Sequence, residues 1–298
     1  LSKVNNFKNC TVVNNINIFR NTAFTTFDLS NLTEIPQGIL WECKNLQTVI
    51  LSEDTTTIGS YAFSECTSLQ TINLPDGLTT MNDYMFGNCK SLESIIIPES
   101  VTKLGNRTFM GCENLLTVNI PENVTNLGNR VFYGCKKLNN IDISHISTIG
   151  GDNVFEGCES LTSLNFNGDG NVGDRAFYGC KKLTTIGEKI LTSIGTNAFG
   201  YCESLLNLNL SEDCNISSPA FIGCNSLNIT INGEELSNYS IIDGLLCDKI
   251  GTHIYGCAAP ITACIIPDTI TSIAEGAFEG RNFTSIDFGN SIKRIPKN

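Results

Sequence analysis

Hydrophobic residues recur in a fixed order along most of the chain. Three segments, beginning at Leu69, Leu92 and Leu115, read Leu-x-x-Ile-x-Leu or a close variant, and each begins 23 residues after the one before. Apolar and polar positions alternate within a segment, so the apolar side chains share one face, which predicts a half-buried β-strand. A proline directly follows each segment and, because it has no backbone N–H, predicts the end of the strand.

A second marker, Phe-x-x-Cys, repeats with the same period. Its eight copies are spaced by 22 or 23 residues and comprise Phe63 and Cys66, Phe86 and Cys89, Phe109 and Cys112, Phe132 and Cys135, Phe155 and Cys158, Phe177 and Cys180, Phe199 and Cys202, and Phe221 and Cys224. A further copy has Leu40 before Cys43, and a degenerate copy at Phe278 has Arg281 in the cysteine position. This register predicts one structural unit per repeat, with Phe and Cys in ladders through the core.

Each repeat is too short to bury its own apolar face, so neighbouring repeats must stack into a solenoid with a continuous core. The sequence predicts about ten coils whose strands form a parallel sheet. For the second half of a repeat, such as residues 104–109, we expect a short extended segment and a tight helical turn on the outer side. The glycines that obey the repeat are predicted to mark a tight backbone turn; they are Gly59, Gly105, Gly128, Gly150 and Gly195.

The combined motif Ile-Pro-x-x-Val-x-x-Leu-Gly-x-x-x-Phe-x-x-Cys-x-x-Leu, present in residues 97–115 and 120–138, resembles the BspA-like class of leucine-rich repeats. The resemblance covers roughly residues 32–295. It implies a leucine-rich-repeat solenoid, a right-handed β/α superhelix with a parallel β-sheet. It also implies a surface protein of gut or oral bacteria or of a parasitic protist. Because the family is defined by its scaffold, the resemblance says little about the ligand.

The repeat pattern divides the chain into four segments. Residues 1–31 are rich in Asn and are predicted to be a divergent first coil that caps the solenoid. Residues 32–231 form the main repeat array. Residues 232–260 contain no repeat and are predicted to be a β-hairpin insertion, with strands at 239–247 and 253–255 around a glycine-containing turn; a protrusion that binds a partner is the other interpretation. Residues 261–298 resume the repeats.

The composition excludes several classes of function. With 19 Lys+Arg against 30 Asp+Glu the formal net charge is -11, so the chain has no basic surface for nucleic acid or an anionic membrane. No apolar run is long enough to insert directly into a membrane. The only histidines, His145 and His253, are expected at exposed polar positions, and no glycine motif for phosphate binding is present. The chain is therefore predicted not to be an enzyme and to need no cofactor.

Nine of the 14 cysteines lie in the ladder from Cys43 to Cys224. Their regular inward position predicts reduced, buried thiols, because a free cysteine packs as a small hydrophobic residue. Ladder neighbours are expected near disulfide distance, but distance alone does not give the required dihedral angle. A zinc site is the alternative for the C-terminal set of Cys247, His253, Cys257 and Cys264; its spacing matches no paired Cys-x-x-Cys motif, so no metal is expected.

The outward positions of the predicted sheet are small and polar, and they form the candidate binding face. Its residues are Thr71, Asn73, Thr117, Asn119, Asn140, Asp142, Ser163, Asn165, Asn207 and Asn209. The face has no aromatic residue, which argues against sugar recognition by stacking, and a solvated face without a ligand is the other interpretation. A rival site consists of two basic and aromatic spots on the outer side; they are Tyr133 with Lys136 and Lys137, and Tyr178 with Lys181 and Lys182.

These features predict a non-enzymatic protein. The resemblance to the BspA-like repeats implies that it is secreted or at the cell surface and mediates adhesion or protein–protein recognition, with a protein ligand such as a host surface or matrix protein bound through the sheet face. The alternative is a structural spacer that holds another domain of a larger surface protein away from the cell. A binding face should lose affinity when single side chains change, whereas a spacer should not. The sequence leaves the ligand and the oligomeric state open.

Overall fold

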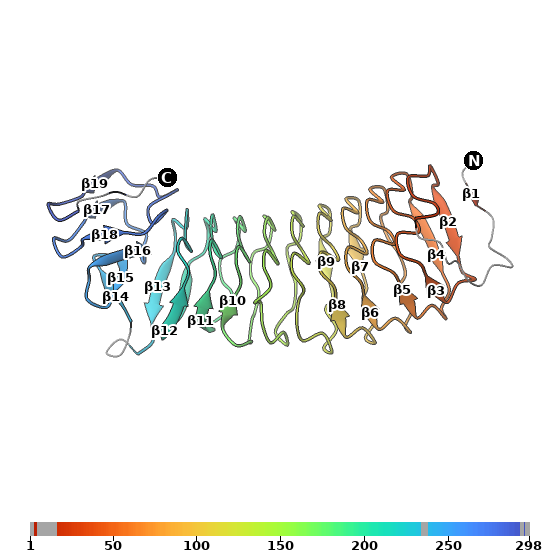
Figure 1. Ribbon diagram of the computed structural model, residues 1–298, viewed down its shortest axis with the longest axis horizontal. Helices are drawn as coiled ribbons and strands as arrows, with labels where there is room; N and C mark the ends of the chain where they lie inside the picture. Colours follow the sequence, from red (N-terminus) through yellow and green to blue (C-terminus); the bar gives the residue numbers. More distant parts are fainter. Residues whose placement is uncertain (1–2, 5–16, 234–237, 293–294, 296–298) are drawn as a thin grey trace.

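The computed structural model describes residues 3–4, 17–233, 238–292 and 295. They form an elongated parallel β-solenoid of about 12 turns, with short strands stacked along its length (Figure 1). The predicted stacking of repeats is therefore confirmed, with more turns than expected. Degenerate repeats near the ends also join the stack; β2 (Thr26–Leu29), for example, pairs in parallel with β4 (Thr48–Leu51).

The first halves of the repeats lie in one stack, in which short parallel strands form in several coils, and we call its outward side the sheet face. Besides β2 and β4 it contains β1 (Lys3–Val4), β7 (Ser94–Ile95), β9 (Thr117–Val118), the first part of β12 (Asn207–Ile216) and β13 (Asn228–Ile231). The register places each residue beside its equivalent in the next repeat, as with Phe27 and Val49. Apolar residues therefore meet on the inside and polar residues on the outside.

A second stack follows from the short extended segment predicted for the second half of each repeat. It contains β3 (Glu34–Ile35), β5 (Thr57–Ile58), β6 (Thr80–Met81), β8 (Lys103–Leu104) and β10 (Asn171–Val172), continued by β11 (Ile190–Ile194) and the second part of β12. Single bridges, such as Leu104 with Leu127, fill the intervening coils. The first and second stacks thus form two sides of the solenoid.

The third side of each coil, the turn side, differs from the prediction. The described residues contain no helix, so neither the helical turn nor the β/α character is found. The backbone gives the reason: residues on both sides of the ladder phenylalanine have positive φ, as at Arg107 (58°) and Gly111 (72°) around Phe109. A helix needs consecutive right-handed residues, which this alternation prevents. The N–H of Phe109 instead donates to the carbonyl oxygen of Val131 in the next coil, at 3.0 Å.

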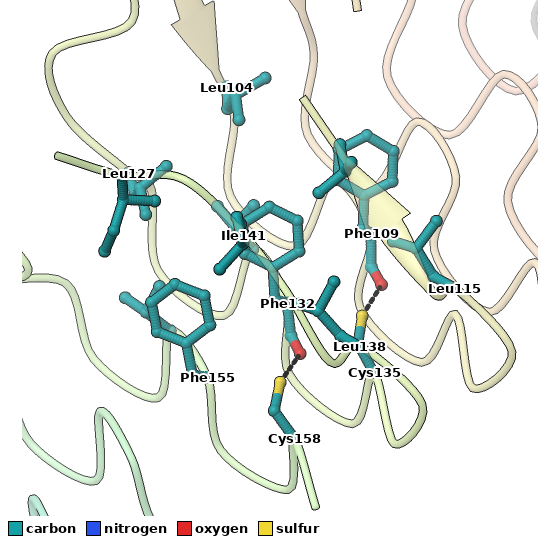
Figure 2. Close-up of a cluster of buried hydrophobic side chains, with 14 of the residues drawn as sticks. Leu104, Phe109, Leu115, Leu127, Phe132, Cys135, Leu138, Ile141, Phe155 and Cys158 are labelled. Carbon is teal, nitrogen blue, oxygen red and sulfur yellow. Dashed lines mark hydrogen bonds between the residues drawn. The ribbon is translucent and has the colours of Figure 1, made fainter. Parts of the chain in front are cut away.

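The phenylalanine ladder runs through the core along the solenoid axis. From Phe63 to Phe221 the rings stack on one another, with centroids 5.5 to 6.3 Å apart. Each ladder thiol donates a hydrogen bond to a carbonyl oxygen of the preceding coil. Figure 2 shows two of these bonds, from Cys135 to Phe109 and from Cys158 to Phe132, both 3.2 Å. The thiol thus fills space and satisfies a buried carbonyl group, and it does so only when reduced.

The segment predicted as an insertion leaves the parallel pattern. Strands β14 (Tyr239–Ile242), β15 (Leu245–Asp248) and β16 (His253–Cys257) are antiparallel. There are three strands and not two, because Asp243 and Gly244 both have positive φ and form a tight turn within the segment expected to be one strand. The coils then resume, since β16 pairs in parallel with β18 (Ser272–Ile273), and β17 (Ala263–Ile265) with β19 (Ser285–Asp287).

The three boundaries between the four segments, at residues 31, 231 and 260, stay a prediction. Most of the predicted N-terminal cap, residues 1–2 and 5–16, lies outside the described residues. Within the described part, β1 pairs in parallel with β2, which is consistent with an additional coil at this end.

The repeated glycines allow the coils to approach closely, and they do not have the turn conformation that was predicted. Gly59 and its equivalents have no positive φ. A Cβ atom on Gly59 would lie 2.4 Å from the backbone nitrogen of Gln37, and one on Gly105 would lie 2.7 Å from that of Asp83. Any side chain at Gly59 or Gly105 therefore meets the backbone of the preceding coil, whereas a Cβ atom on Gly150 would meet only side-chain atoms of Thr148 and Asn171.

Gly59→Ala should lower the free energy of unfolding by about 1–3 kcal/mol, the usual cost of forcing volume into a packed region. Gly77→Ala is the matched control, because a Cβ atom there has no contact shorter than 3.6 Å. Urea denaturation measures both variants. Equal midpoints for the two would contradict a role in close approach.

Candidate functional site

The predicted binding face lies on the first stack, and its side chains form two columns along the solenoid. Nine of the ten predicted residues are exposed, and Asn209 is half-buried. In the first column, the strand register places Thr117 between Ser94 and Asn140, and Ser163 beside Thr185. The structure therefore brings the predicted residues together as rows on neighbouring coils.

Three of the predicted residues have structural partners. The side-chain amide of Asn119 accepts from the Ile97 N–H (2.8 Å) and donates to the Ile97 carbonyl oxygen (2.9 Å), so it joins two coils. Asp142 accepts from the backbone N–H (3.0 Å) and hydroxyl (2.8 Å) of Ser144, and these bonds lower the pKa of its carboxyl group. Asn209 accepts from the hydroxyl of Thr230. These three side chains stabilise the scaffold and have less freedom to meet a ligand.

The other seven predicted residues make no side-chain hydrogen bond to another described residue. They are Thr71, Asn73, Thr117, Asn140, Ser163, Asn165 and Asn207. Their amides and hydroxyls can both donate and accept, carry no charge and are short. Two apolar residues missing from the predicted set share the second column: Ile50 is 45% and Ile96 is 80% exposed. The sequence register already places both in the outward column of the strands, but they were not included in the candidate face.

The two rival spots on the turn side line a single groove. Tyr133, Lys136, Tyr178 and Lys181 all contribute to it, whereas Lys137 and Lys182 do not. Lys136 forms an ion pair with Glu113 (2.9 Å), and Lys181 with Glu159 (3.6 Å). Paired in this way, the lysines do not give the groove the basic character that the sequence indicated.

An aromatic stack precedes this groove on the turn side. The rings of Trp41, Tyr61 and Tyr84 lie on consecutive coils, with centroids 5.3 and 4.6 Å apart. Guanidinium groups cover both ends of the stack, from Arg20 over Trp41 (3.8 Å) and from Arg107 over Tyr84 (5.2 Å). The Tyr61 and Tyr84 rings stack face to face, whereas the Trp41 ring is tilted by 40° to that of Tyr61, and these contacts join consecutive coils.

The described cysteines and histidines do not form a metal-binding cluster. The thirteen described cysteines are free and buried, and no group of three or more His, Cys, Asp or Glu residues within the described ranges is placed to hold a metal ion. The prediction for His145 was wrong: its side chain is only 12% exposed, with Nδ1 3.9 Å from Glu122. His253 Nδ1 lies 2.7 Å from the Ser272 hydroxyl, but no hydrogen bond to a described residue orients its other ring nitrogen.

The strand stacks and the ladders of buried Leu, Ile, Phe and Cys define a leucine-rich-repeat solenoid. The family model of the BspA type leucine rich repeat region matches with six copies, over residues 2–91, 33–162, 79–205, 138–243 and 248–298. The chain belongs to this family, as its repeated motif predicted. No curated protein matches it.

Two solved structures show the same architecture. A leucine-rich repeat protein from Bacteroides ovatus is 26% identical, with a TM-score of 0.65 over 91% of this chain. The chain spans only 62% of that protein's length. A leucine rich cell surface protein from Faecalibacterium prausnitzii is 20% identical, with a TM-score of 0.53 over 93% of this chain and 82% of the other. In the part of the chain that the structure describes, no helix has the length and apolarity of a membrane span.

Proposed function

We propose that the chain is a non-enzymatic recognition module of a cell-surface or secreted protein, and that its sheet face binds a protein ligand. The observation that carries the proposal is the set of seven exposed polar side chains that the scaffold does not use. Aligned in two columns, they present donors and acceptors in rows, and their small size lets a partner approach the backbone closely. Membership of a leucine-rich-repeat family supports a role in protein contacts.

The absence of enzymatic activity is part of this proposal. Acyl transfer needs a nucleophile, a histidine base within hydrogen-bond reach, and a group that orients the base. Ser272 and His253 supply the first two, but His253 Nδ1 makes the contact and the backbone N–H of His253, not its ring, donates to Asp248. The pair therefore resembles a surface hydrogen bond between neighbouring strands and not a catalytic site.

The polar character of the face favours a ligand bound by hydrogen bonds around a small apolar contact. Each hydrogen bond contributes about 0.5–1.5 kcal/mol net, so affinity would require several rows at once. Ile50 and Ile96 supply exposed apolar surface at the N-terminal end of the second column. This combination suits a folded protein surface better than a small molecule, because the face is a row of side chains along many coils.

The proposal is tested by measuring binding to a panel of matrix proteins, cell-surface proteins and glycans. The test variant carries Asn140→Arg and Asn165→Arg, which add bulk and charge where the side chains are free. Asn119 is avoided because its replacement would also break a contact between coils. The control variant carries Thr57→Arg and Asn215→Arg, two exposed positions on the second stack without side-chain hydrogen bonds to other described residues.

We expect saturable binding of one panel member by the wild-type and control chains, and a loss of at least about tenfold in the test variant, equivalent to about 1.4 kcal/mol. Circular dichroism confirms that each variant is folded. Binding by neither wild type nor variants would favour the spacer, which the elongated shape and continuous core also suit (Figure 1). Equal binding by all three chains would place the ligand on another surface.

A further inference from the structure

The groove on the turn side crosses four consecutive coils and is built differently from the rest of that side. Three groups of residues and Glu156 line it. We call the tyrosines Tyr133, Tyr178 and Tyr201 one wall, the glycines Gly134, Gly157 and Gly179 the floor, and the charged residues Lys136, Glu159, Lys181 and Glu203 the other wall. Its volume is about 360 Å³. We call it the tyrosine–glycine groove.

The backbone conformation alone does not explain the glycine lane. The lane residues have φ between 70° and 74°, but the same position holds Glu65 (61°) and Asn88 (58°) in coils before the groove and Tyr201 (57°) in the last coil of the groove. A Cβ atom on Gly157 would meet only Gly134, at 3.6 Å, so space above the floor is open. Side chains are therefore absent from the floor over consecutive coils where the fold tolerates them, and the bare backbone is accessible between two walls.

Two of the three tyrosines, Tyr178 and Tyr201, are held in place beside this floor. A Cβ atom on Gly200 would lie 2.7 Å from the ring of Tyr178, and one on Gly223 would lie 2.8 Å from the ring of Tyr201. Each ring thus leans over a glycine of the next coil. Arg175 covers one side of Tyr178 at 3.8 Å and pairs with the buried carboxylate of Glu156, which fixes that ring further. The wall is preorganised, which lowers the entropic cost of binding.

The floor offers no unpaired N–H groups to an added β-strand. The N–H groups of Gly134, Gly157 and Gly179 already donate to carbonyl oxygens of the next coil, at 2.7 to 2.8 Å. A strand that adds to a sheet edge needs such groups free, whereas a polyproline II segment is recognised by packing on aromatic side chains. The lining therefore favours a proline-rich segment over a β-strand.

The spacing of the tyrosines and the charge of the groove both agree with a polyproline II ligand. Tyr133 and Tyr178 lie two coils apart, about 10 Å at the spacing of parallel strands, and one turn of polyproline II rises about 9 Å. The lysines of the opposite wall are neutralised by Glu113 and Glu159. At the C-terminal end, Glu203 forms no ion pair with a described residue, and Glu279 accepts only the Tyr201 hydroxyl (3.0 Å). That end is acidic and complements a cationic residue.

We propose that the tyrosine–glycine groove binds a proline-rich partner segment in the polyproline II conformation, with a Lys or Arg of the segment at the Glu203 end. Prolines two coils apart pack against Tyr133 and Tyr178 above the bare glycine floor. This surface lies on the turn side, away from the sheet face, so the two interactions are independent.

The test is isothermal titration of the full chain with an oligoproline peptide that ends in arginine. Gly157→Asn fills the floor, and asparagine suits a left-handed position, as Asn88 shows. Gly187→Asn is the matched control, because Gly187 also has positive φ (87°) and room for a side chain, but lies outside the groove. A peptide with alanine in place of proline, and a neutral oligosaccharide, are the comparison ligands.

We expect the wild-type chain to bind the oligoproline saturably and to bind the alanine peptide at least about tenfold more weakly. The affinity of Gly157→Asn for the oligoproline should fall by the same factor, and that of Gly187→Asn should be unchanged. Glu203→Gln should weaken the arginine-tagged peptide but not an untagged one. Thermal unfolding shows whether Gly157→Asn is folded, and Tyr133→Ala provides a second test if it is not. Equal affinity for proline and alanine peptides, no binding, or binding only of the oligosaccharide would each overturn the proposal.

Discussion

Raising the pH from 8 to about 10 in the presence of a reductant should unfold the chain. Burial raises the pKa of the ladder thiols well above the ordinary value of 9.0, as at Cys135 and Cys158, and raises the pKa of Cys214 and Cys247 to about 12. In the unfolded chain the same thiols ionise near pH 9. Above that pH the unfolded state binds fewer protons than the folded state. The stability that the protonated thiols contribute is therefore fully present below pH 9 and is lost as the pH rises toward the folded pKa values.

The expected size of this effect is large because the cysteines act together. Each thiol with a raised pKa removes about 1.4 kcal/mol of stability per pH unit in this window. Thirteen buried thiols would therefore offset a typical folding free energy of about 5–15 kcal/mol within about one pH unit. No ordinary set of surface carboxylates would give a transition in this range.

Urea denaturation at pH 7, 8, 9 and 10, followed by circular dichroism, measures the dependence. A variant with Cys135→Ala and Cys158→Ala is the control for tyrosine and lysine ionisation, which it leaves unchanged. Above pH 9 the free energy of unfolding should fall with pH less steeply in this variant than in the wild type. The two slopes should differ by about 3 kcal/mol per pH unit. A free energy of unfolding that stays constant between pH 8 and 10 would contradict the buried, protonated ladder.

Phe132→Ala should lower the free energy of unfolding by about 3–5 kcal/mol. The ring of Phe132 is fully buried and stacks between those of Phe109 (5.7 Å) and Phe155 (5.5 Å), so its removal leaves a cavity that rigid neighbours on two sides cannot fill. Figure 2 shows the three rings in line. Because coils contact mainly their neighbours, the loss should also weaken cooperativity between the two halves of the solenoid.

Chemical denaturation measures this change. The control is Phe283→Ala, since Phe283 is only partly buried near the C-terminal end and makes a single edge contact with Phe278. Its cost should be less than half that of Phe132→Ala. An unchanged midpoint for Phe132→Ala would refute the assignment of this residue to the core ladder.

The repeating strands and ladders could be predicted because they depend on hydrophobic periodicity, which the sequence displays directly. The turn side could not. Its backbone is left-handed at residues such as Arg107, Arg130 and Asn153, which also occur in right-handed turns, so residue type does not reveal the conformation. Gly59 presents the converse case: glycine suggested an unusual φ, whereas the contact with the preceding coil is what excludes a side chain.

The candidate site was only partly predictable for a related reason. Asn119 and Asn165 occupy the same column and have the same side chain. Only Asn119 forms side-chain hydrogen bonds with the backbone of the preceding coil, at Ile97. That difference depends on the local path of the preceding coil. Likewise, Tyr133 and Tyr178 are far apart in sequence, and stacking of the coils is what joins them in one groove. His145 is half-buried for the same reason, although its neighbours in sequence suggested exposure.

The most direct test of recognition through the sheet face is an alanine scan against the panel member that the wild-type chain binds. Calorimetry would compare Asn140→Ala, Ser163→Ala and Asn165→Ala with Thr57→Ala and Asn215→Ala on the second stack. We expect each of the first three to weaken binding by several-fold while the last two leave it unchanged. Losses confined to the second stack, or no loss at any position, would contradict the account.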